Sequence, residues 1–199
     1  DQLKYSDMID AFGKAIEALE DDNLFGFNDE DISFCSYWLG FAYNRTEKYD
    51  SAMVYANKAI EIDSEEFGEY SIETGTDYLV LANAYSGKYD RENAKKYFRK
   101  SISILEYLDD DEMESVDLGV SYNDFGVFFV ENYEYDSAVY YYKKSLAVYE
   151  NGGSEADKAI TYYNLGQAYS YKYNYEQAKT YYEKAYNSYK SEYGEYDSR

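Results

Sequence analysis

Apolar and small residues recur along the chain at spacings of three and four, which places them on one face of an α-helix. Four alanines, separated by 42, 44 and 40 residues, are each followed by packing residues at the fourth and seventh positions: Ala52, Ala94, Ala138 and Ala178. Twelve residues before each alanine lies another small residue, with a large apolar residue directly before it and an aromatic residue three positions after it. The pattern predicts two helices per repeat, joined by a short turn.

The last copy shows the pattern most fully. Its two halves read Tyr162-x-x-Leu165-Gly166-x-x-Tyr169 and Ala178-x-x-x-Tyr182-x-x-Ala185. The small residue of the first helix is expected to let the paired helix approach closely. In the four successive repeats this residue is Gly40, Ala82, Gly126 and Gly166. Helices are expected to begin after polar capping residues, at Asp90, at Asn174 with Gln177, and at Ser154 with Asp157.

The net charge of the chain restricts the classes of partner that it can bind. The 199 residues include 19 basic and 40 acidic ones, for a net charge of −21. Such a surface repels phosphate backbones and anionic lipid heads, which argues against nucleic acid and membrane partners and favours a basic peptide or protein patch. The charge also has a simpler reading, that it keeps an aromatic-rich chain soluble. With no apolar stretch near the roughly 18 residues of a membrane span and no signal-peptide core, a cytoplasmic location is favoured.

The residue types also argue against catalysis. Histidine and proline are absent, and the single cysteine, Cys35, lies among aromatic residues where a packed thiol is expected. No glycine-rich phosphate loop occurs, and the many carboxylates are expected to form solvated helix faces. A segment beginning at Asp21 has some spacing of a calcium loop, but Phe25 and Ile32 replace the required oxygen ligands. We therefore expect no enzymatic activity, no cofactor and no metal site.

The spacing resembles that of the tetratricopeptide repeat, a helix-turn-helix unit. The period of 40 to 44 residues exceeds the usual 34, and the proline that closes the second helix is missing, as in the extended repeats of kinesin light chains. The resemblance implies an all-α, right-handed superhelical solenoid of about nine helices. It also implies a single domain that spans residues 1–199. Residues 1–25 would form the second helix of a partial repeat, and residues 192–199 would begin a truncated one. Between them lie four full repeats, at residues 29–66, 70–108, 112–150 and 154–191.

The resemblance further implies a function. In such solenoids the first helices line a concave groove that binds extended peptides. The groove residues carried over by alignment are Tyr37, Trp38, Phe41, Asn44, Arg45, Asn83, Ser86, Asn123, Asp124, Val127, Tyr163, Asn164, Gln167 and Tyr171. Trp38 is the best apolar anchor for a ligand, although it could instead pack against the preceding helix around Phe12. Amides such as Asn83, Asn123 and Asn164 suit a peptide backbone because each offers a donor and an acceptor.

These features predict a non-catalytic scaffold or adaptor that binds a protein or peptide, within a fragment of a longer repeat protein. Two alternatives remain: a peptide-sensing regulatory domain of a larger regulator, and a structural repeat that self-assembles weakly through uncovered ends. A clamp for acidic chaperone tails is not favoured, because Arg45 is the single basic residue assigned to the groove, where Asp124 and Glu131 oppose it.

Overall fold

The computed structural model describes residues 2–21, 29–109 and 116–194. Across these ranges the chain forms nine α-helices and no strand, so the predicted all-α fold is confirmed. Outside them lie most of the rejected calcium loop, at residues 22–28, most of the acidic run at 109–112 and the end of the predicted truncated repeat at 195–199. Two compact units divide the chain, Asp1–Asp111 and Glu112–Arg199, and each is described by itself.

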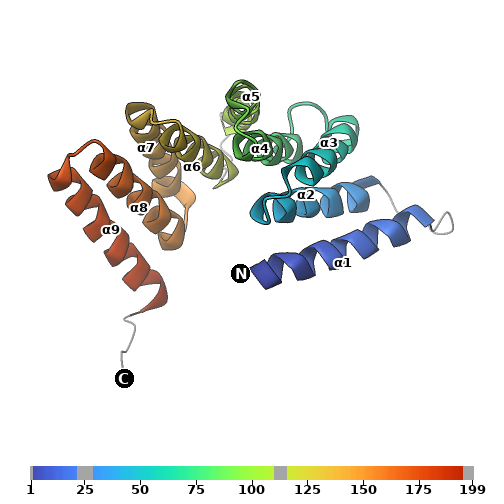
Figure 1. Cartoon of the computed structure of the whole chain (residues 1–199), viewed down its shortest axis with the longest axis horizontal. Coiled ribbons are helices and arrows are strands. Elements are labelled where there is room, and N and C mark those ends of the chain that lie inside the picture. The colour runs from blue at the N-terminus through green and yellow to red at the C-terminus, as the bar shows by residue number, and fades with distance from the viewer. Residues whose placement is uncertain (1, 22–28, 110–115, 195–199) are drawn as a thin grey trace. The chain divides into compact units, whose positions relative to one another are not determined.

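Unit 1 contains five helices, and every second helix packs against the first helix of the next pair. Their bounds are α1 Gln2–Asp21, α2 Asp29–Arg45, α3 Tyr49–Glu66, α4 Ile72–Gly87 and α5 Arg91–Asp109. The helix α1 lies along α2, α2 pairs with α3, α3 packs on α4, and α4 pairs with α5 (Figure 1). The core contains small and aliphatic residues on the facing helix stripes, such as Leu39, Ala56 and Leu81, each less than 2% exposed, together with the fully buried Phe98.

Unit 2 repeats the same arrangement with four helices. Their bounds are α6 Val116–Glu131, α7 Tyr135–Gly152, α8 Glu155–Tyr171 and α9 Tyr175–Tyr193. The pairs are α6 with α7 and α8 with α9, and α7 packs on α8 (Figure 1). The helices α6 and α8 fall within the residue ranges expected for the repeats, whereas α7 and α9 each extend two residues past them. The grouping of all repeats into one domain stays a prediction.

The helix starts follow from local capping chemistry. Ser154 and Asp157 form a reciprocal capping box, with Ser154 Oγ accepting from the Asp157 backbone N–H at 3.1 Å and Asp157 Oδ2 accepting from the Ser154 N–H at 3.0 Å. Asn174 Oδ1 accepts from the Gln177 N–H at 3.2 Å, and Asp90 Oδ1 accepts from the Asn93 N–H at 3.1 Å. The three predicted helix starts are therefore confirmed.

The small residue in the first helix permits the close approach that the pattern predicts. A Cβ atom added to Gly126 would lie 2.4 Å from Cε1 of Tyr142, and one on Gly166 would lie 2.6 Å from Cε1 of Tyr182. Real Cβ atoms do not come so close to a ring carbon. In both repeats of unit 2 a tyrosine of the second helix therefore rests directly on the backbone of the first, which explains why glycine occupies this position there.

The turn between the two helices of each repeat contains a residue in the left-handed region. It lies five residues before the repeat alanine and is Glu47, Tyr89, Tyr133 or Tyr173, with φ between 59° and 62°. The N–H of the following residue donates to the carbonyl five positions back, as in Asp90 to Tyr85 at 3.0 Å. This is a Schellman-type helix end built without glycine. The sequence pattern did not predict it.

Candidate functional site

The residues assigned to the groove lie on the first helix of each repeat, as expected. Those of unit 1 are on α2 and α4: Tyr37, Trp38, Phe41, Asn44, Arg45, Asn83 and Ser86. Those of unit 2 are on α6 and α8: Asn123, Asp124, Val127, Tyr163, Asn164, Gln167 and Tyr171. They form two separate candidate faces, one for each unit.

Trp38 is the centre of an aromatic cluster in unit 1. Its ring is stacked with that of Phe12 of α1, with centroids 6.5 Å apart and planes inclined by 10°. Phe34, Tyr37 and Phe41 meet its ring edge to face at 6.2, 5.2 and 5.7 Å. The packing of Trp38 against the preceding helix, one of the two alternatives, is therefore present. Trp38 is half-buried, and its role as a ligand anchor stays a prediction.

Replacing Trp38 with Ala should detach α1 from the rest of unit 1. Among the described elements α1 packs against α2 alone, and Trp38 supplies the stacked contact between them. Loss of a half-buried tryptophan should cost about 2 kcal/mol locally, less than the ~3–5 kcal/mol of a fully buried one. Hydrogen exchange should then become faster in α1 while α8 and α9 keep their protection. Val54→Ala, which removes an exposed apolar side chain from α3, is the control; unchanged exchange in α1 of Trp38→Ala would contradict the prediction.

The polar residues of the unit 1 face are tied to the fold. Asn44 Nδ2 donates to the Val80 carbonyl of α4 at 2.8 Å, so this amide joins two first helices. Its Oδ1 is buried and has no hydrogen-bond partner among the described residues. Arg45 lies over the ring of Phe41, with its guanidinium carbon 5.0 Å from the ring centroid. Asn83 and Ser86 are half-buried on α4.

Two of the predicted amides meet in unit 2. Asn164 Nδ2 on α8 donates to Asn123 Oδ1 on α6 at 2.9 Å, which links consecutive first helices. Next to them, Gln167 Nε2 donates to the Tyr163 hydroxyl at 3.2 Å. The contacts orient all four polar side chains before any ligand is present. Asp124 and Val127 are half-buried on α6.

Two tyrosines flank these amides and keep about half of their surface exposed. Tyr163 is 49% exposed, and its ring lies 5.7 Å from that of Tyr182. Tyr171 is 48% exposed and is stacked on Tyr135 of α7, with centroids 5.3 Å apart. Each ring is thus held by packing on one side and open to solvent on the other. We call Asn123, Asp124, Val127, Tyr163, Asn164, Gln167 and Tyr171 the amide face.

A buried carboxyl pair in unit 1 was missed by sequence reasoning. Asp63 of α3 and Asp77 of α4 are 5% and 1% exposed, and they lie close enough to share a proton. Burial, and then the neighbouring Asp63 carboxylate, raise the pKa of Asp77 to about 9. Burial also raises the pKa of Asp63. A signal was present, since Asp77 shares the three-four spacing of the buried residues Leu81 and Ala84.

The groups considered for chemistry are otherwise packing residues. Cys35 is 8% exposed, and burial raises the pKa of its thiol, which disfavours the reactive thiolate. Burial, with Asp124 nearby, also raises the pKa of Tyr142, so this phenol stays neutral. The described residues contain no group of three or more His, Cys, Asp or Glu side chains arranged to hold a metal ion. None of the described helices is both long enough and apolar enough to cross a membrane.

The solved structures that resemble this fold include the following three. BtubC (BKLC) from P. vanneervenii matches with a TM-score of 0.76 and 20% identity, covering 98% of this chain and 77% of that chain. A Rap protein complexed with Competence and Sporulation Factor matches with a TM-score of 0.79 and 18% identity. That match includes 96% of this chain and 51% of the Rap protein. TPR-like repeats of a kinesin light chain from Podosopora anserina match with a TM-score of 0.66 and 14% identity, covering 96% and 90%.

Sequence comparison agrees with the structural similarity. A search of curated proteins found no match. The family model for the tetratricopeptide repeat matches residues 33–106 and 117–191, which together make up most of the chain. These ranges include both helices of every pair from α2 to α9 in whole or in large part. The chain therefore belongs to the tetratricopeptide repeat family, whose fold is typical of protein–protein interaction modules.

Proposed function

We propose that the chain is a non-catalytic interaction module that binds an extended peptide along the amide face of unit 2. The observation that carries the proposal is the hydrogen bond between Asn164 and Asn123. It uses one donor and one acceptor, so Asn123 Nδ2 and Asn164 Oδ1 keep their capacity to bond a ligand backbone. Because a peptide backbone carries the same groups at every residue, this pair supports binding with little dependence on sequence.

The flanking tyrosines would supply most of the affinity. Tyr163 and Tyr171 each present an open ring, and rings held by packing lose little conformational entropy when a ligand covers them. Aromatic residues of this kind dominate interface hot spots. Asp124 on the same face and the net charge of −21 favour a ligand with basic side chains.

The proposal can be tested with peptides selected from a displayed random library on the full chain. Selected peptides should be enriched in Lys and Arg, and their binding should weaken as salt increases. Tyr163→Ala should weaken binding by at least about tenfold. Asn164→Ala should weaken it by about fivefold, as expected for one or two lost hydrogen bonds. Affinities are measured by fluorescence anisotropy.

Tyr140→Ala is the matched control, since Tyr140 is 56% exposed but lies on α7, a second helix. Its affinity for the same peptides should equal that of the unmodified chain. If Tyr140→Ala weakens binding and Tyr163→Ala does not, the site lies on the opposite surface and the proposal fails.

A sensory role is a second candidate, supported by the similarity to the Rap protein that was solved with Competence and Sporulation Factor. In this role the chain would be the ligand-binding part of a larger regulator. Binding of a selected peptide would then change hydrogen exchange well beyond α6 and α8. Changes confined to these two helices would favour the adaptor role.

A further inference from the structure

Among the nine helices that the structure describes, α5 alone carries a net positive charge, although the chain as a whole carries −21. Its three acids are spread along the helix, whereas its five basic residues all lie in the first ten positions: Arg91, Lys95, Lys96, Arg99 and Lys100. Every other helix of unit 1 has more acidic than basic residues. Positive charge is thus concentrated on one helix of an acidic chain.

One of these five residues has a structural role that recurs in other repeats. Lys100 lies six residues after its repeat alanine, and a lysine occupies this position in every repeat: Lys58, Lys100, Lys144 and Lys184. Lys100 Nζ lies 5.8 Å from the ring centroid of Tyr78, a residue of the first helix, and the lysines of α7 and α9 make the same kind of contact. Lys100 also forms an ion pair with Glu69. Its charge therefore serves the fold.

The basic residues one, two and five positions after the repeat alanine are Lys95, Lys96 and Arg99, and no such role recurs for them. The same positions hold Met53, Val54 and Asn57 on α3, and Val139, Tyr140 and Lys143 on α7. The second and fifth positions are exposed on every second helix from α3 to α9. They are exposed on α3 and α7 although a following first helix packs there, so this outer face is open whether or not another repeat follows.

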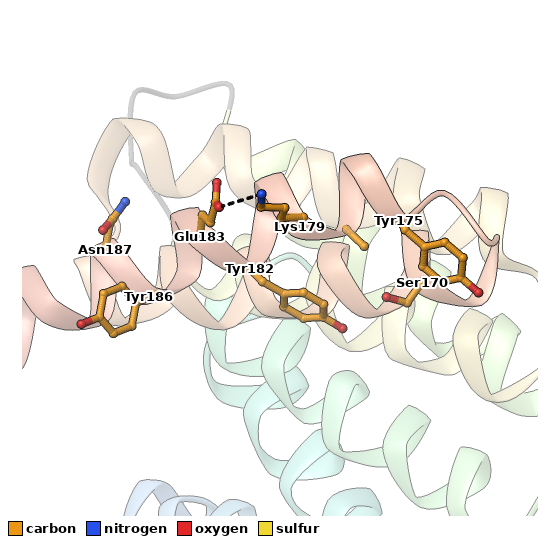
Figure 2. Close-up of a pocket in the computed structure, with 8 residues that line it drawn as sticks. Ser170, Tyr175, Lys179, Tyr182, Glu183, Tyr186 and Asn187 are labelled. Carbon is orange, nitrogen blue, oxygen red and sulfur yellow. Dashed lines mark ion pairs between the residues drawn. The ribbon is translucent and has the colours of Figure 1, made fainter.

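The three charges are neighbours on the helix surface, which does not favour the helix. Lys95 and Lys96 lie one turn before Arg99, and like charges at this spacing are destabilising. On α9 the positions of Lys95 and Arg99 are held by Lys179 and Glu183, which form an ion pair at 3.9 Å (Figure 2). Helix stability would therefore favour an acid at position 99, and the fold does not explain Arg99.

Two of these charges lie on the surface without an acid of their own. Lys96 Nζ lies 4.9 Å from the ring centroid of the neighbouring Tyr97, and Lys96 and Arg99 are both exposed. Neither of them forms an ion pair with another residue that the structure describes. Lys95 is half-buried beside them. We call Lys95, Lys96 and Arg99 the α5 basic patch.

We infer that the α5 basic patch binds a short acidic segment of a partner protein, in which two or three carboxylates lie close together. The guanidinium group of Arg99 can hold one carboxylate through two parallel hydrogen bonds, and the ammonium group of Lys96 can pair with a second. Residues 95–99 span only about 6 Å of the helix axis, so the patch matches a few charges and no more. The inference goes beyond the amide face, which favours a basic ligand.

The charge of the whole chain sets the length of the ligand. At about 100 mM salt, exposed charges act on one another over about 10 Å. A long polyanion such as a nucleic acid would extend past the patch and meet the acidic helices around it, which repel it. A short acidic segment of a protein avoids this repulsion because its charge stays within the patch.

The probe is a capped peptide, Gly-Glu-Glu-Gly-Glu-Glu-Gly, added to the isotope-labelled full chain at about 100 mM salt. Its binding is followed by amide chemical shifts in NMR spectra. It should bind with a Kd on the order of 1 mM, since exposed ion pairs are individually weak. The shift changes should be centred on residues 95–100. The same peptide with Gln in place of Glu should cause no saturable change.

Arg99→Glu should weaken binding of the acidic peptide by at least about fivefold. Its melting temperature should not be lower than that of the unmodified chain, because a Glu at this position lies one turn after Lys95 and Lys96. Lys143→Glu is the matched control, since it makes the same change of charge at the same repeat position on α7. This control and Tyr163→Ala, a substitution in the amide face, should both leave the affinity unchanged.

Equal binding of the Gln peptide, or equal loss of affinity in Arg99→Glu and Lys143→Glu, would overturn the inference. A lower melting temperature of Arg99→Glu would also contradict it, because Arg99 would then serve the fold. Two further measurements test the identity of the ligand. Binding of a short single-stranded DNA that is lost in Arg99→Glu would identify a nucleic acid instead. Sedimentation that shows a dimer which dissociates in Arg99→Glu would identify a second copy of this chain instead.

Discussion

Replacing Asp77 with Asn should stabilise unit 1 at neutral pH and make its stability less dependent on pH. The Asp77 carboxyl is 1% exposed, and the neighbouring Asp63 is 5% exposed. An ionised carboxylate at this depth has lost its hydration, and a second acid beside it makes ionisation still less favourable. Asn has nearly the same shape and carries no charge, and its amide can donate to Asp63. We expect a gain on the order of 2 kcal/mol at pH 8.

The sign of the pH dependence follows from proton uptake. The pKa of Asp77 is about 9 in the folded state and 3.8 by reference, so between these values the folded chain binds the proton and the unfolded chain releases it. Raising the pH through this window favours unfolding by up to about 1.4 kcal/mol per unit. The stabilising contribution is complete below pH 4 and is lost by pH 9. The advantage of Asp77→Asn should therefore increase between pH 5 and pH 8.

Urea denaturation at pH 5, 6, 7 and 8 measures this difference directly. Glu61→Gln is the matched control, since it replaces a carboxyl group with an amide at an exposed position on α3. It should leave both the stability and its pH dependence close to those of the unmodified chain. A stability difference between Asp77→Asn and the unmodified chain that stays constant with pH would show that Asp77 is ionised in the fold.

Replacing Gly126 with Leu should unfold unit 2 or lower its melting temperature by more than about 10 °C. The first atom of any side chain at this position would overlap the ring of Tyr142, at 2.4 Å from Cε1 and 2.5 Å from Cδ1. Tyr142 is 2% exposed, so its ring has no space into which it can move. The expected cost is at least about 3 kcal/mol, which exceeds the ~1 kcal/mol that Leu gains over Gly in helix propensity.

Gly13→Leu makes the matched comparison. No atom lies within 4 Å of a Cβ built on Gly13 of α1, so the same substitution there meets open space. It should be neutral or stabilising by up to about 1 kcal/mol. Both variants are compared by thermal unfolding followed by circular dichroism. Equal melting temperatures would mean that the packing of Tyr142 on Gly126 does not determine the stability of unit 2.

The fold could be predicted from local sequence signals because the same signals occur in every repeat. The alanine period gave the helix pairs, and Ser154 with Asp157 gave a helix start that depends on residues three apart. The positions of the turns were predicted but their conformation was not, since Tyr89, Tyr133 and Tyr173 adopt a left-handed conformation that is usually assigned to glycine. There the backbone hydrogen bonds of the turn outweigh the preference of the side chain.

The candidate site could be predicted less completely, because it depends on which side chains meet across helices. Asn123 and Asn164 lie three and two residues before their repeat glycines, so their positions in the repeat differ, yet their amides bond. The spacing of Trp38 fits both a ligand anchor and a residue that packs against the preceding helix, so spacing alone could not reveal its contact with Phe12. Asp77 was missed because every acidic residue was assumed to be solvated. Its position on the apolar stripe of α4 instead makes it buried.

The most direct test of peptide binding at the amide face is to locate a bound peptide by crosslinking. A library-selected peptide carrying a photoreactive group is irradiated with the full chain, and the crosslinked residues are identified by mass spectrometry. Binding along the first helices of unit 2 predicts crosslinks to α6 and α8, with Tyr163 and Tyr171 among the modified residues, and their loss in Tyr163→Ala. Crosslinks concentrated on the second helices α7 and α9, and retained in Tyr163→Ala, would contradict it.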